Sequence, residues 1–254
     1  MTENLDSLIW STYFGGADDD GIYSVIVSND SNIYIAGGTR STDIPIDTSM
    51  AFQSTKTNTF PNHYYASIEG FFAKIAKDGS AVQAGSYFGS NQYDQSYFIR
   101  EDRTDDVYLY GQSFKFGTHF IKDAAFNVPN SSGVITKFTP SLDSIMWSTT
   151  FGGGDRRIGI SPTAFMVDLC NKVYLSGHGY VFDFPLTADA FQKTTVNKDF
   201  YFMVLEDDAS SLYYATYFGG NLSNEHVDGG TSRFDNKGIL YQSACAGCQN
   251  NSDL

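Results

Sequence analysis

The sequence predicts an all-β fold built from repeated antiparallel strands, and two observations support this prediction. The first is composition. Aromatic residues make up 16% of the 254 residues and charged residues only 18%, a bias that suits the pleated faces of strands. The 24 glycines against 6 prolines also indicate many tight turns. The second observation is an internal repeat with a period of about 65 residues.

Four copies of one short motif mark this repeat. The copies read Trp10-Ser-Thr-Tyr-Phe-Gly-Gly16, Gly85-Ser-Tyr-Phe-Gly-Ser90, Trp147-Ser-Thr-Thr-Phe-Gly-Gly153 and Ala215-Thr-Tyr-Phe-Gly-Gly220. The glycine after Phe lies at positions 15, 89, 152 and 219, which gives spacings of 74, 63 and 67 residues. Spacings of this length are typical of repeats that form one supersecondary unit each.

Three further motifs follow the first in a constant order. The second motif reads Asn32-Ile-Tyr-Ile-Ala-Gly37, Asp106-Val-Tyr-Leu-Tyr-Gly111, Lys172-Val-Tyr-Leu-Ser-Gly177 and, more loosely, Gly238-Ile-Leu-Tyr-Gln-Ser243. The third combines Asp43-Ile-Pro-Ile with Ala51-Phe-Gln53, then Asp183-Phe-Pro-Leu with Ala190-Phe-Gln192, and keeps only Ala125-Phe-Asn127 in the second repeat. The fourth reads Gly70-Phe-Phe-Ala-Lys-Ile75, Gly133-Val-Ile-Thr-Lys-Phe138 and Asp199-Phe-Tyr-Phe-Met-Val204.

Each unit therefore contains about four short strands separated by turn signals. In Val173-Tyr174-Leu175 both strand faces are apolar, as expected for a sheet packed between two others. We therefore predict a β-propeller of about four-stranded antiparallel blades of about 65 residues. A β-helix would have shorter coils, and a β-sandwich would not repeat at this length. The approximate units are residues 8–83, 84–144, 145–211 and 212–254, the last one truncated.

The composite pattern resembles the bacterial SBBP repeat, a seven-bladed β-propeller repeat, from Trp10 to the C-terminus. The match is strong in the first and third repeats, while Gly117-Thr-His-Phe120 replaces Asp-Ile-Pro in the second. The fourth repeat, with Cys245-Ala-Gly-Cys248, resembles a variant found in large Bacteroidetes surface proteins that use type IX secretion. The resemblance implies a secreted or cell-surface protein, and the family has no assigned catalytic activity.

Both ends of the chain interrupt the repeat. Leu5–Thr12 aligns with Leu142–Thr149, but the strand that precedes the later copy has no counterpart before Met1. At the other end, Asp253-Leu254 aligns with Asp183-Phe184. We therefore expect a fragment of a longer protein, with an incomplete propeller of about four blades. The alternative is strand exchange between the first and last blades, which would close a four-bladed ring.

The formal net charge of −13 argues against partners with phosphate backbones or anionic lipid surfaces. The sequence has no apolar run long enough to span a membrane and no signal peptide at its start. We expect a protein or glycan ligand at the propeller rim and neighbouring domains of the same polypeptide as partners, with no nucleic acid and no membrane insertion.

No catalytic motif is present. The chain lacks a Gly-x-Ser-x-Gly elbow, and His63, His119, His178 and His226 do not follow any metal-ligand spacing. We therefore expect a non-catalytic structural or binding segment with no catalytic, cofactor-binding or metal residues. The alternative is a carbohydrate-active hydrolase, because two carboxylates about 5 to 9 Å apart can come from distant parts of the sequence.

Acidic loops are candidates for calcium. Gly16-Ala-Asp18-Asp19-Asp20-Gly21 holds three adjacent carboxylates, and such oxygen ligands can bind a hard cation. The spacing does not match an EF-hand loop, so we expect solvated turn residues here, with calcium as the alternative.

Three cysteines and one aromatic loop complete the candidates. Cys170 stands alone in a strand-like stretch and is expected to be a small buried hydrophobe. In an exported protein, Cys245 and Cys248 would form a local disulfide, with free thiols as the alternative. His63-Tyr64-Tyr65, in a long insertion, would either contact a ligand or cover the rim.

Overall fold

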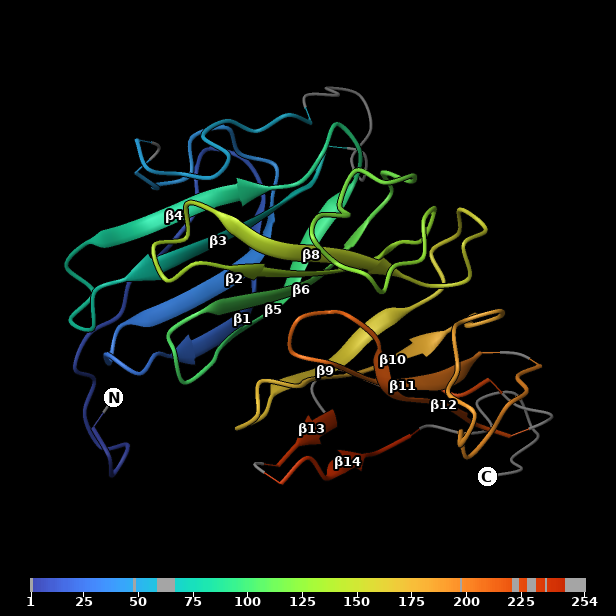
Figure 1. The fold of residues 1–254 in the computed structure, drawn as a ribbon. Helices are drawn as coiled ribbons and strands as arrows, with labels where there is room; N and C mark the ends of the chain where they lie inside the picture. Colours follow the sequence, from blue (N-terminus) through green and yellow to red (C-terminus); the bar gives the residue numbers. More distant parts are fainter. Residues whose placement is uncertain are drawn as a thin grey trace.

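The computed structural model describes residues 2–47, 49–58, 67–196, 198–220, 224–227, 232–235 and 237–244. These residues form fourteen β-strands and no helix, which confirms the predicted all-β class. The strands make three four-stranded antiparallel sheets and one two-stranded sheet (Figure 1). In every sheet the strands lie side by side in chain order, as they do in the blade of a propeller.

The four sheets follow one another along the chain. Sheet 1 contains β1 (Asp20–Val27), β2 (Ile33–Thr39), β3 (Glu69–Ile75) and β4 (Val82–Phe88). Sheet 2 contains β5 (Asp94–Glu101), β6 (Val107–Ser113), β7 (Gly133–Phe138) and β8 (Ile145–Phe151). Sheet 3 contains β9 (Ser161–Val167), β10 (Val173–Gly179), β11 (Asp199–Leu205) and β12 (Leu212–Phe218). Sheet 4 contains β13 (Ser232–Phe234) and β14 (Leu240–Gln242).

The sequence motifs map onto these strands, but with a shift in phase. The Ile-Tyr-Ile motif forms the second strand of each sheet, and the fourth motif forms the third strand. The Trp-Ser-Thr-Tyr-Phe motif, which opens the repeat in the sequence, supplies the last strand of a sheet at β8 and its counterparts at β4 and β12. The boundaries of the predicted units therefore fall just before or inside the fourth strand of a sheet, so each boundary divides one sheet.

The first hairpin of sheets 2, 3 and 4 turns on an aspartate. Asp102 Oδ1 accepts hydrogen bonds from the backbone N–H of Thr104 (2.9 Å) and of Asp106 (3.0 Å). Asp168 and Asp235 accept the same two bonds from the residues two and four positions later. An aspartate that binds its own backbone two residues on stabilises a tight turn, so one residue type sets the same hairpin three times.

The third motif also has a structural role, because its glutamine binds the glycine turn that ends the sheet. Gln53 Oε1 accepts a hydrogen bond from Gly89 N (3.1 Å), and Gln192 Oε1 accepts one from Gly219 N (3.0 Å). Asn127 stands in this place in the second repeat, and its Nδ2 donates to Ala124 O (3.2 Å). The shorter side chain binds locally instead of crossing to the turn.

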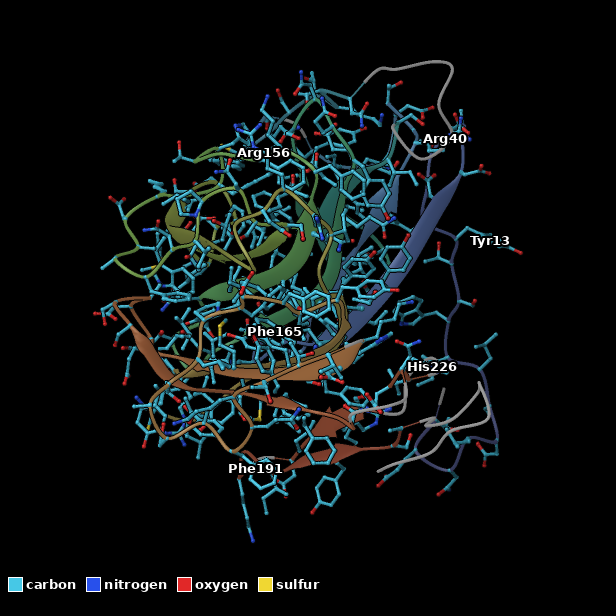
Figure 2. The ribbon with its side chains drawn as sticks, turned by 90° about the vertical axis from the view of Figure 1, so that its right-hand side faces the viewer. Tyr13, Arg40, Arg156, Phe165, Phe191 and His226 are labelled. Carbon is cyan, nitrogen blue, oxygen red and sulfur yellow. The ribbon has the colours of Figure 1, made fainter. Side chains whose placement is uncertain are left out.

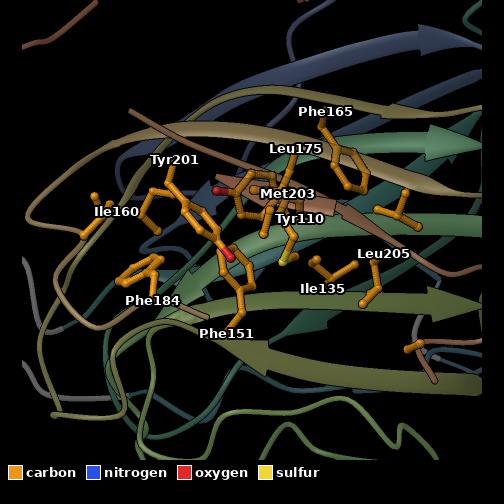
Figure 3. Packing of buried hydrophobic residues seen from close by; sticks show 14 of the residues in the cluster. Tyr110, Ile135, Phe151, Ile160, Phe165, Leu175, Phe184, Tyr201, Met203 and Leu205 are labelled. Carbon is orange, nitrogen blue, oxygen red and sulfur yellow. The ribbon is translucent and has the colours of Figure 1, made fainter. Parts of the chain in front are cut away.

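The core lies between adjacent sheets. One buried cluster packs sheet 2 against sheet 3 and includes Tyr110, Phe151, Phe165, Tyr201 and Met203 (Figure 3). A second cluster packs sheet 1 against sheet 2. Every residue of β6 and β7 is buried, which confirms that the central sheet is covered on both faces.

The sheets are arranged like propeller blades, but the ring is open. The first strands β1, β5 and β9 contact one another in that order, and β13 contacts β9. Among the described residues the arrangement does not close on itself. The first strands of all four sheets therefore lie near one central axis, which is the usual place for a ligand in a propeller-like fold.

Candidate functional site

A pocket of about 670 Å³ lies where the first strands of the four sheets approach one another. Phe165, which lines it, is at the centre of the molecule in Figure 2. The volume falls within the range of about 300–1,000 Å³ that is usual for small-molecule sites. The lining residues are Tyr23, Ser24, Val25, Ile26, Phe98, Arg100, Pro162, Thr163, Ala164, Phe165, Met166, His178, Val227, Ser232, Arg233 and Phe234.

Arg100 is the most constrained charged residue of this pocket. It lies on β5, where its Nη1 donates to its neighbour's carbonyl, Ile99 O (2.7 Å), and contacts Ser24 Oγ of β1 (3.5 Å). Its guanidinium also lies over the ring of Phe98, 5.8 Å from the centroid. Among the described residues, Arg100 forms no ion pair with a carboxylate.

Arg233 brings a second positive charge to the same pocket from β13. Burial lowers the pKa of the Arg100 guanidinium, and the nearby charge of Arg233 lowers it further. An arginine nevertheless stays charged at neutral pH. The pocket therefore holds two like charges, and none of its described lining residues is an aspartate or a glutamate.

Neither arginine was identified from the sequence, although the repeat contains a signal for each. The strand registers align Arg100 with Ile26 and Met166. They align Arg233 with Val25, Ile99 and Phe165. Each arginine is thus a charged residue at a position that is apolar in the other copies, and an apolar position that becomes charged in one repeat indicates a local function.

Two of the four histidines come together beside this pocket. The rings of His178 and His226 lie 6.5 Å apart, and His178 lines the pocket. No spacing in the sequence joins these two histidines, because they belong to different repeats. His119 stacks edge-on against Phe120 elsewhere, and His63 lies outside the described residues. In the described part of the chain, no three His, Cys, Asp or Glu residues group as metal ligands.

The carboxylates of the predicted acidic loop bind protein groups. Asp20 Oδ2 accepts hydrogen bonds from Gly16 N (2.7 Å) and Ser41 Oγ (3.0 Å). Arg40 Nη1 lies 3.2 Å from Asp19 and 3.7 Å from Asp18. Asp18 and Asp19 are exposed turn residues, as expected, whereas Asp20 is half-buried and binds the loop's own backbone and Ser41.

Asp94 and Glu69 form a buried carboxylate pair at the junction of sheets 1 and 2. Asp94 Oδ2 accepts hydrogen bonds from Ser90 N (2.6 Å) and Ser90 Oγ (2.9 Å). Burial raises the pKa of the Asp94 carboxyl to about 7, and the charge of Glu69 contributes. A raised pKa of this kind suits a general acid. The cavity beside Asp94, however, measures only about 10 Å³, which is too small for a sugar ring.

The prediction for Cys170 is wrong. Cys170 is exposed and has a free thiol, because it lies in the turn between β9 and β10 rather than in a strand. Its backbone N–H donates to Asp168 Oδ1 (2.8 Å), and Asn171 next to it has a positive φ of 62°. The predicted Cys245–Cys248 disulfide and the His63-Tyr64-Tyr65 loop lie outside the described residues. Within the described ranges, no helix is long and apolar enough to cross a membrane.

Comparison with known proteins gives one match. No curated protein matches the chain. The family model for SBBP, described as a beta-propeller repeat, matches residues 9–45. This stretch contains the Trp-Ser-Thr-Tyr-Phe-Gly-Gly motif, strands β1 and β2, and the Asp43-Ile-Pro motif. Residues 9–45 are therefore similar to the SBBP β-propeller repeat, and the repeated antiparallel sheets agree with this similarity.

Proposed function

We propose that this chain is a non-catalytic binding segment of a larger exported protein, in which repeated sheets present a ligand site at their common axis. One observation carries the binding role. Four sheets, far apart in the sequence, each contribute their first strand to one pocket with aromatic and basic walls. A pocket built from several rigid elements is typical of small-molecule recognition.

The chemistry of this pocket favours binding over hydrolysis. A glycoside hydrolase normally needs one carboxylic acid and one carboxylate across the scissile bond, and the described walls supply neither. Arginine cannot replace them, because it does not release its proton at neutral pH. Aromatic and arginine side chains instead provide contact area and orientation.

The exported location rests on the SBBP repeat and on the resemblance to Bacteroidetes surface proteins. In such a protein the segment would act in adhesion, as a scaffold or in ligand display, outside the cell or on its surface. Its partners would be a glycan or protein ligand and the neighbouring domains. The net charge of −13 agrees with a soluble surface.

A binding screen tests the proposed role directly. The full chain is applied to immobilised neutral and acidic glycans and to extracellular proteins, and the same protein is incubated with chromogenic glycosides. We expect reversible, saturable binding to at least one class and no turnover above a heat-denatured control. Release of chromophore in proportion to protein concentration would contradict the non-catalytic role.

The location has its own test. Antibodies against the chain are used to probe denaturing gels of the medium, the membranes and the cytoplasm of the source cells. We expect a band well above 28.0 kDa in the medium or at the cell surface. A band confined to the cytoplasm would overturn the exported assignment.

A further inference from the structure

We propose that the pocket on β1, β5, β9 and β13 binds an anionic saccharide, a sugar bearing a carboxylate, and that Arg100 and Arg233 hold the carboxylate. This inference rests on the proposed binding function and narrows its ligand to one chemical class. The proposed binding position is the central axis, whereas the sequence analysis predicted a ligand at the propeller rim.

The charge of the pocket is the opposite of the charge of the protein. The chain carries 29 acidic residues against 16 basic ones. The described walls of this pocket nevertheless contain two arginines and no acidic side chain. A positively charged recess in a strongly acidic surface concentrates anions at that one place, so the field of the pocket selects an anionic ligand.

Arg100 is half-buried, where a cation normally has a partner, and the exposed Arg233 lies near enough for its charge to act on Arg100. Like charges that approach each other in a partly desolvated pocket repel more strongly than they do in water. Neither arginine has a carboxylate partner among the described residues. A bound carboxylate would relieve this repulsion, and the energy gained would appear as affinity.

Arg100 is also held ready for a ligand. Nη1 binds Ile99 O at 2.7 Å and the ring of Phe98 lies beneath the guanidinium. These contacts fix the plane of the group and leave the N–H groups of Nε and Nη2 without a partner in the described structure. A guanidinium held by one edge can present its other edge to a carboxylate in bidentate fashion.

The walls around the arginines suit a sugar. Tyr23 and Phe234 add aromatic faces, and Thr163 and Ser232 add hydroxyl groups. Tyr23 is itself fixed by stacking on Tyr97, with the ring centroids 5.4 Å apart. Aromatic area with a few polar groups is the usual composition of a small-molecule site, and about 670 Å³ is far more than a bare inorganic anion needs.

Calorimetric titration of the full chain with three probes tests the proposal. The probes are glucuronate, glucose as its neutral counterpart, and inorganic sulfate as a bare anion. We expect glucuronate to bind at least about tenfold more tightly than either of the other two, because only glucuronate offers both a carboxylate and a ring. Raising the salt concentration should weaken its binding.

Three variants assign the effect to the arginines. Arg100→Gln and Arg233→Gln should each weaken glucuronate binding by about tenfold, the loss of one charge-assisted contact. Arg103→Gln, which removes the same charge at an exposed position three residues from Arg100, should leave binding unchanged. Arg233 is exposed, so its variant should fold even if Arg100→Gln does not, and circular dichroism checks both.

The outcomes separate this inference from the proposed function. Equal affinity for glucuronate and glucose, or full binding in the Arg233→Gln variant, would overturn the anionic-saccharide site. Equal affinity for sulfate and glucuronate would replace it with a simple anion site. If the glycan and protein screen still finds a ligand in any of these cases, the binding function survives. Turnover in the chromogenic assay contradicts that function alone.

Discussion

Two tryptophans make the same contact in two different parts of the molecule. Trp147, in β8, packs on sheet 3 and its indole Nε1 donates to Asp207 O, in the turn between β11 and β12 (3.0 Å). Trp10 donates in the same way to Lys77 O, in the corresponding turn of sheet 1 (3.1 Å). Residues 10–16 therefore contact sheet 1 as β8 contacts sheet 3.

The phenylalanines of the two motifs repeat this likeness. Phe151 stacks on Tyr201 with an interplanar angle of 18°, and Phe14 stacks on Phe71 with an angle of 16°. Phe71 and Tyr201 occupy equivalent positions of β3 and β11. Each motif thus presents the side chains at alternate positions to the neighbouring sheet, as the period of a strand requires.

The difference lies on the other face of the motif. Tyr87 of β4 and Tyr217 of β12 are 2% and 3% exposed, because loops of their own sheets cover them. Tyr13, at the same position of the motif, is fully exposed and points away from the ribbon (Figure 2). Residues 8–16 form no strand and pair with no strand in the described chain. Contact with a neighbouring sheet is therefore not enough to make this motif a strand, which also needs a sheet of its own.

Hydrogen exchange should show the largest contrast. β8 pairs with β7 along its length, so alternate amides of β8 bond to β7, and Ser148 N donates to Lys122 O (2.8 Å). These bonded amides should open only with most of the fold. The amides of residues 8–15 have no backbone partner in the described structure and should exchange about a thousandfold faster or more. Mass spectrometry of peptides covering residues 8–16 and 145–151 measures both. Similar protection would show that residues 8–16 have a strand partner in solution.

Removal of the two indoles should separate the two regions next. Trp147 is 5% exposed, and Trp147→Ala should cost about 3–5 kcal/mol of unfolding free energy because it leaves a cavity between two sheets. Trp10 is only half-buried, so Trp10→Ala should cost about 1 kcal/mol or less. Urea unfolding followed by circular dichroism compares the two variants. Equal losses would mean that residues 10–16 are packed as firmly as β8.

The same comparison explains how much the sequence could predict. The strands were predictable because each motif repeats the residues that a sheet buries on both faces, as Tyr34, Tyr108 and Val173 show. Which strand begins each sheet could not be predicted. The tyrosine of the Trp-Ser-Thr-Tyr-Phe motif is buried by loops that precede it in the chain, and the motif alone does not reveal this.

The pocket could not be predicted from the sequence either. Its two arginines are 133 positions apart in the chain, and only the arrangement of the sheets brings them together. The prediction that Cys170 is buried in a strand was wrong because its sequence is strand-like, whereas Asp168 accepts a hydrogen bond from the backbone of Cys170 and forms a turn there. The hairpin aspartates at equivalent positions could have corrected this prediction.

A buried acid at one junction should give the stability a distinctive pH dependence. Ser90 N binds Asp94 as Gly16 N binds Asp20, but Glu69 lies beside Asp94. Because burial raises the pKa of Asp94 to about 7, the folded state keeps a proton that the unfolded state has lost. The contribution of this group to stability therefore falls as the pH rises from about 4 through 7.

Asp94→Asn removes this dependence. Asparagine cannot ionise and still accepts the bonds from Ser90, so the variant should be about 1–3 kcal/mol more stable than the wild type at pH 8. The gain should shrink at pH 4.5, where Asp94 is protonated in the folded state. Thermal unfolding at the two pH values measures it, and a pH-independent difference would show that Asp94 is ionised throughout. Asp20→Asn, the matching change at the first turn, is the control, because Asp20 is only half-buried whereas Asp94 is 2% exposed.

The smallest effect should come from two hydroxyl groups at the same position of the motif. Tyr87 OH donates to Ser41 O (3.2 Å) in a buried site, where Thr39 Oγ1 also donates to the same carbonyl (3.3 Å). Tyr87→Phe removes one of these two donors and should cost about 0.5–1.5 kcal/mol. Tyr13 is exposed to solvent, where water replaces any lost bond, and Tyr13→Phe should be neutral within the error of urea unfolding. A cost at Tyr13 that equals the cost at Tyr87 would mean that the outer face of residues 10–16 is covered in solution. The contrast between the two regions would then reflect a missing neighbour and not a property of the motif.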